Sequence, residues 1–143
     1  MPQIERIISR GQLLELTFMQ DAVAASQSDV QLLVAEVTSA ANNAVDGYVM
    51  PWAGEIVAIS ARLSAAATAG LLTVGATIGG TEKTDPTLSI TTAQSAYDTA
   101  PRGTTQFAAG DLIGAEITTN SGWDATTADL AVSVFVIVYI DGI

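Results

Sequence analysis

Between residues 30 and 140 the chain is a succession of short runs rich in Val, Ile and Thr, and each run ends at Gly, Asp, Asn or Pro. Residues that branch at Cβ favour strands, whereas Gly, Pro, Asn and Asp favour turns. This part of the chain lacks a convincing helical pattern. The alternation of runs and turns therefore predicts an all-β fold, namely an antiparallel β-sandwich or jelly roll.

We expect about eight strands. The clearest alternation falls at residues 55–64, where every second side chain from Val57 to Leu63 is apolar. The Gly79–Gly80 pair indicates a turn, and residues 81–86 and 94–103 are expected to be loops. The expected strands span residues 30–39, 47–50, 55–64, 71–78, 87–92, 104–108, 112–119 and 129–140.

The last expected strand is apolar on both faces. Val132, Val134 and Val136 would lie on one face, with Phe135 and Ile137 on the other. Exposed, such a strand would promote aggregation, so it is expected at the centre of a sheet. Its second face has two interpretations, either a thick sandwich core or a subunit interface. The apolar run is too short to cross a bilayer as a helix.

Composition limits the partners. The chain has 143 residues, enough for one domain, with 5 basic and 15 acidic residues and a net charge of −10. Neither nucleic acid nor an anionic membrane is expected as a partner, because both require clustered cations. Only 14% of the residues are charged. This low value favours an oligomer in which other subunits cover part of the surface.

The first 28 residues have few turn residues and several large aliphatic side chains, unlike the short runs that follow. We therefore divide the chain into an N-terminal arm at 1–28 and a jelly-roll domain at 29–143. An extended arm could bind a neighbouring subunit through apolar anchors. It could equally form the first strand of its own domain. The candidate anchors are Ile4, Ile7, Ile8, Leu13, Leu14, Leu16 and Phe18.

Residues suited to catalysis are scarce. The chain has no His and no Cys, so no catalytic residue, cofactor site or metal site is predicted. Glu82 with Asp85, and Asp124 with Asp129, are interpreted as solvated turn residues. A hydrolase that uses two carboxylates is a third hypothesis.

Three aromatic residues are candidate loop contacts. Trp52 and Trp123 each lie near glycines, and Tyr97 lies in the expected loop at 94–103. Exposed aromatic side chains can stack on sugars or bind a protein partner. For the tryptophans, the alternative is that they close an end of the sandwich.

Two segments, residues 50–80 and 107–136, resemble small jelly-roll proteins of tailed phages. The AGD turn at 109–111 and the SGWDATTAD stretch at 121–129 carry this resemblance. In overall plan the chain resembles the capsid decoration, or cement, proteins of long-tailed phages of thermophilic bacteria. That resemblance implies a homotrimer on the outer surface of the virion capsid. It would bind the major capsid protein, and its arms would clasp neighbouring trimers. The alternative is a receptor- or glycan-binding module of a head fibre or tail tip.

Overall fold

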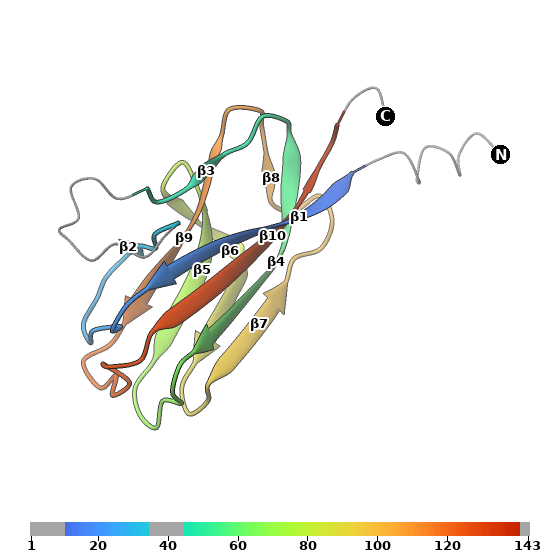
Figure 1. The fold of residues 1–143 in the computed structure, drawn as a ribbon. Coiled ribbons are helices and arrows are strands. Elements are labelled where there is room, and N and C mark those ends of the chain that lie inside the picture. Colours follow the sequence, from blue (N-terminus) through green and yellow to red (C-terminus); the bar gives the residue numbers. More distant parts are fainter. Residues whose placement is uncertain (1–10, 35–44, 141–143) are drawn as a thin grey trace.

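The computed structural model describes residues 11–34 and 45–140, which form two antiparallel sheets packed face to face (Figure 1). Sheet A has the order β1 (Gln12–Gln20), β10 (Leu130–Val138), β4 (Gly54–Leu63) and β7 (Ser95–Thr99), and β8 (Gln106–Phe107) also pairs with β4. Sheet B has the order β2 (Val30–Gln31), β9 (Leu112–Thr119), β5 (Leu72–Ile78) and β6 (Thr81–Ile90), and β3 (Tyr48–Val49) also pairs with β9.

The strand order is that of a jelly roll. The first strand, β1, pairs with the last strand, β10, and the connections then pass repeatedly between the two sheets. The predicted fold class is therefore confirmed. The described residues contain no helix, and hence none that is long and apolar enough to cross a membrane.

The core lies between the sheets and follows from strand alternation. In β10, Val132, Val134, Val136 and Val138 are buried, whereas Ala131 points outward and is exposed. Because β10 lies between β1 and β4, the prediction of a central last strand is also confirmed.

Two predicted loops are strands. Residues 81–86 were expected to be a loop, but they form the first half of β6, which pairs with β5. Residues 95–99, within the second expected loop, form β7 and pair with β4. Both are edge strands of their sheets, and their polar sequences lack the apolar alternation that marks a buried strand. The Gly79–Gly80 turn is present, with φ angles of 61° and 79°.

The expected strand at 30–39 is much shorter in the structure. Only Val30 and Gln31 form β2, opposite Ile117 and Glu116 of β9. Leu33 makes a single bridge to Met19 of β1 and so connects the edges of the two sheets. Positions 35–39 lie outside the described residues.

Candidate interaction surfaces

The described part of the predicted arm pairs with its own domain. Over all nine residues β1 runs antiparallel to β10, with Gln12 opposite Val138 and Gln20 opposite Leu130. This arrangement matches the first-strand alternative that the sequence left open. Ile4, Ile7 and Ile8 lie outside the described residues, so their role as anchors stays a prediction.

The other four anchor candidates divide between the two faces of β1. Leu16 and Phe18 are buried in the core of this chain, and Leu14 packs against that core. Leu13 points the other way and is 62% exposed. Of the described candidates, Leu13 is therefore the one positioned to contact a second molecule.

Trp123 closes one end of the sandwich and is not a surface contact. Its side chain is buried, and its Nε1 donates a hydrogen bond of 3.1 Å to the carbonyl oxygen of Val23. Gly70, at φ 84°, lies so close to the Trp123 backbone that a Cβ there would collide with it. For Trp123, the end-closing alternative is therefore the correct one.

The other two aromatic residues are accessible. Trp52 is 43% exposed in the connection between β3 and β4. Tyr97 is 81% exposed, but it lies in strand β7 and not in a loop as predicted. Because it pairs with Ser60 of β4, its side chain projects from the broad outer face of sheet A.

This outer face, which we call the open face, consists of the side chains of sheet A that point away from the core. No described segment crosses it in Figure 1. The strand register assigns the following residues to it: Leu13, Glu15, Thr17 and Met19 of β1; Ala131, Ser133, Phe135 and Ile137 of β10; Ala58, Ser60 and Arg62 of β4; and Ser95, Tyr97 and Thr99 of β7.

A buried carboxylate closes one end of the open face. Glu55 is 3% exposed, and it accepts hydrogen bonds from the Arg102 guanidinium, the Tyr139 hydroxyl and the backbone N–H of Gly103. Burial alone would raise the pKa of Glu55, but the hydrogen bonds from Tyr139 and Arg102 outweigh burial and lower it. The arrangement joins β4, the β7–β8 connection and the end of β10.

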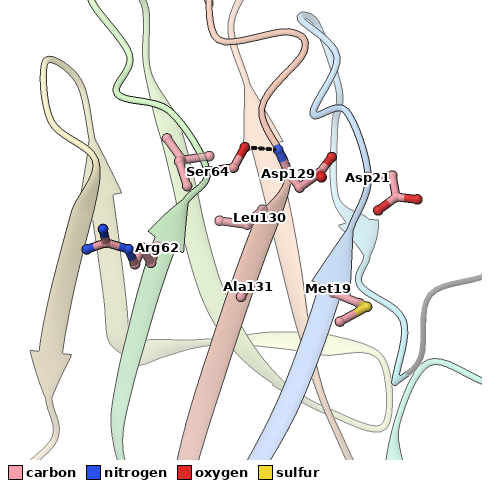
Figure 2. Close-up of a pocket in the computed structure, with 8 residues that line it drawn as sticks. Met19, Asp21, Arg62, Ser64, Asp129, Leu130 and Ala131 are labelled. Carbon is pink, nitrogen blue, oxygen red and sulfur yellow. Dashed lines mark hydrogen bonds between the residues drawn. The ribbon is translucent and has the colours of Figure 1, made fainter.

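The other end of the open face contains a pocket of about 300 Å³ (Figure 2). Its walls come from β1, β10 and β4, and they include Met19, Arg62 and Ala131. The backbone N–H of Asp129 donates a 2.9 Å hydrogen bond to the Ser64 hydroxyl. Figure 2 shows the Arg62 guanidinium directed away from Asp21 and Asp129. Arg62 is thus available to a partner on the open face.

Sheet B carries a cluster of three carboxylates, Asp29, Glu82 and Glu116, whose oxygens lie within 4.8 Å of one another. The Glu116 carboxylate accepts a 2.6 Å hydrogen bond from Gln31, and the absence of a Cβ at Gly75 leaves room for Glu82. Burial, followed by contact with Glu82 and the charge of Asp29, raises the pKa of Glu116.

Sequence reasoning missed this cluster, because it matched Glu82 with Asp85. The three acids come from β6, β9 and the residue before β2, so only the tertiary pairing brings them together. Glu116 within an otherwise uncharged strand was the one available signal. Three carboxylates are suitable oxygen ligands for Ca²⁺, or they can share protons among themselves. The second pair behaves as predicted for turn residues: Asp124 accepts hydrogen bonds from Thr68, and Asp129 accepts one from the Ala22 N–H.

Comparison with solved structures shows a shared fold. A chain in the acidic stable capsid structure of Helicobacter pylori bacteriophage KHP30 aligns with 92% of this chain and 95% of its own length, at 8% identity and a TM-score of 0.50. At this identity the likeness establishes the fold alone. A chain in the Cyanophage Pam1 capsid asymmetric unit aligns over 92% and 86% of the two chains, at 16% identity. Its TM-score of 0.42 is too low to support an argument. The sequence matches no protein family and no curated protein.

Proposed function

We propose that this chain is a structural virion component: a homotrimeric decoration protein that binds the outer surface of a phage capsid and stabilises the shell. The observation that carries the proposal is the fold shared with a chain of a phage capsid structure, over nearly the full length of both chains. The partners would be other copies of this chain and the major capsid protein. Such a role requires no catalytic residue or cofactor.

The stabilising mechanism we propose is additive. Each subunit would extend its N-terminal arm onto a neighbouring trimer and bury apolar side chains there, at roughly 25 cal/mol per Å² of apolar surface. Several arms per trimer would then act together through their high effective concentration. Because Leu16 and Phe18 are occupied in their own core and Leu13 lies on the outer face of sheet A, the arm anchors we assign to the neighbouring trimer are Ile4, Ile7 and Ile8.

The test of the virion role is the copy number of this protein in purified virions, measured by quantitative mass spectrometry. A decoration protein should be present in a number comparable to the major capsid protein. A number many times smaller would point to a fibre or tail component, and absence from the virion would remove the proposed role.

The arm requires a truncation that spares β1. Deleting residues 1–28 would remove a strand of sheet A, so weaker binding by that variant would show only misfolding. Deletion of residues 1–10 is the informative change. It should leave the domain folded and weaken its binding to capsids, with Trp52→Phe as a folded control. Unchanged binding would exclude the arm mechanism.

A second candidate function is a receptor- or glycan-binding module, favoured by the exposure of Trp52 and Tyr97. Glycan-array binding that is lost in both Trp52→Ala and Tyr97→Ala would support it. No binding by the wild-type protein would count against it.

A further inference from the structure

The two outer faces of the sandwich differ in chemistry. In sheet B, the strand register places Thr73, Ser89, Thr87 and Thr118 on the outside, near the carboxylate cluster. This polar face is usual for the solvated side of an antiparallel sheet. The open face of sheet A is different, because large apolar side chains lie along its strands. Of the two outer faces of the sandwich, the open face is therefore the one with the more apolar composition.

The apolar side chains of the open face extend across the sheet. Leu13 on the edge strand β1 is 62% exposed, and Tyr97 on β7 is 81% exposed. Between these strands, Phe135 and Ile137 of β10 are half-buried and point to the same side. Neighbouring apolar groups on a soluble domain commonly mark a surface that a partner covers.

The charged side chains within the strands of this face balance, although the chain as a whole carries a net charge of −10. Within the strands, the open face carries Glu15 and Arg62, and at its end Glu55 is paired with Arg102. Asp21 and Asp129 lie beyond the last strand pairs, at the rim. With a net charge of −10, two copies repel each other over most of their surface. The strands of the open face are where this repulsion is small.

Glu15 and Arg62, which form no ion pair with another described residue, lie on opposite sides of the centre of the face. Glu15 is in the row of Phe135, and Arg62 is in the row of Ala131, two strands away. Ser133 lies between these rows, and its hydroxyl donates a 2.8 Å hydrogen bond to Glu15. Because Glu15 and Arg62 have opposite charges, they offer complementary partners to a second copy placed over the face.

We propose that the open face binds a second copy of this chain, with Glu15 of one copy paired with Arg62 of the next and with Leu13, Tyr97, Phe135 and Ile137 shielded from water between them. The inference rests on the self-association in the proposed function and specifies the face that carries it. The pairing is compatible with a two-fold dimer and with a closed ring, because each copy supplies both charges.

The test is analytical ultracentrifugation of the full chain over a wide concentration range. Glu15→Arg and Arg62→Glu should each raise the dissociation constant about tenfold or more, because each places like charges together. The double variant should return it to within about threefold of wild type, because the pair is restored in reverse. Lys83→Glu, which changes the charge as Arg62→Glu does but lies on sheet B, should leave it unchanged.

Tyr97→Asp tests the apolar part of the face with little risk to folding, because the side chain is mostly exposed. It should weaken association, whereas Trp52→Asp, off this face, should not. Circular dichroism would establish that every variant is folded.

Three results would overturn the inference. If wild type associates and none of Glu15→Arg, Arg62→Glu and Tyr97→Asp weakens it, another face mediates assembly and the proposed function stands. If the single charge reversals weaken association and the double variant does not restore it, the Glu15–Arg62 pairing is wrong. If wild type is monomeric at every concentration, the open face does not bind a copy. The virion copy number then tests the structural role separately.

Discussion

The Tyr139 hydroxyl donates a 2.5 Å hydrogen bond to the carboxylate of Glu55, and so joins the residue after β10 to the beginning of β4. Arg102 and the N–H of Gly103 donate to the same carboxylate. Glu55 is thus a buried carboxylate that accepts hydrogen bonds from several donors. A buried carboxylate without such partners would be costly in free energy.

Glu55→Gln should lower the free energy of unfolding at pH 7 by about 1–2 kcal/mol, because charge-assisted hydrogen bonds become neutral ones. The pKa of Glu55 is lowered in the folded state, so its contribution is complete above the ordinary glutamate pKa of about 4.3. The contribution is lost as the pH falls through the lower, folded-state pKa. Urea unfolding at a series of pH values would measure this, and Glu55→Gln should show a weaker loss of stability in acid. An identical pH profile for the two proteins would contradict the assignment.

Glu116 should have the opposite pH dependence. Its pKa is raised in the folded state, so protonation favours the folded protein. Its stabilising contribution is complete below the ordinary glutamate pKa and is lost as the pH rises through the raised value. Glu116→Gln should therefore be more stable than wild type at pH 7, and this difference should disappear in acid.

The same unfolding series measures this second effect. Glu55→Gln serves as the comparison, because it is expected to be less stable than wild type at pH 7. A Glu116→Gln protein that is less stable than wild type at pH 7 would contradict the expectation. It would mean that the ionised carboxylate is needed there.

The two tryptophans should differ sharply in their effect on stability. Trp123→Phe removes the hydrogen bond to Val23 and leaves a cavity, and should cost about 2 kcal/mol. Trp52→Phe is the matched control and should change stability by less than about 0.5 kcal/mol, because that side chain is partly exposed. Urea unfolding followed by circular dichroism would compare them. Equal effects would show that Trp123 does not close the sandwich.

Phe18 tests whether β1 belongs to the folded domain. Phe18→Ala should lower the free energy of unfolding by about 3–5 kcal/mol, because the Phe18 ring is buried and makes an edge-to-face contact with the Tyr48 ring, with 5.5 Å between the ring centroids. Leu13→Ala, on the open face of the same strand, should change the stability of the domain by less than about 0.5 kcal/mol at concentrations where it is monomeric. A Phe18→Ala variant as stable as wild type in urea unfolding would mean that β1 is dispensable for the fold.

The fold class could be predicted because its signals are local. In β4 and β10 the period of two is directly visible, and Gly79–Gly80 marks a turn without reference to any partner. β7 and the first half of β6 were missed for the converse reason. Both are polar edge strands. They are strands only because β7 pairs with β4 and β6 pairs with β5.

The candidate surfaces depend even more on tertiary structure. The sequence contained an acidic chain, a mostly apolar last strand and a distinct N-terminal segment, and these features predicted assembly in general terms. Only the fold placed Phe18 inside the core and Leu13 outside, because the pairing with β10 determines which face of β1 is buried. Only the fold gathered Asp29, Glu82 and Glu116, and placed Glu15 on the same face as Arg62. Alternation and turns act over a few residues, whereas strand register is determined by contacts between residues far apart in the chain.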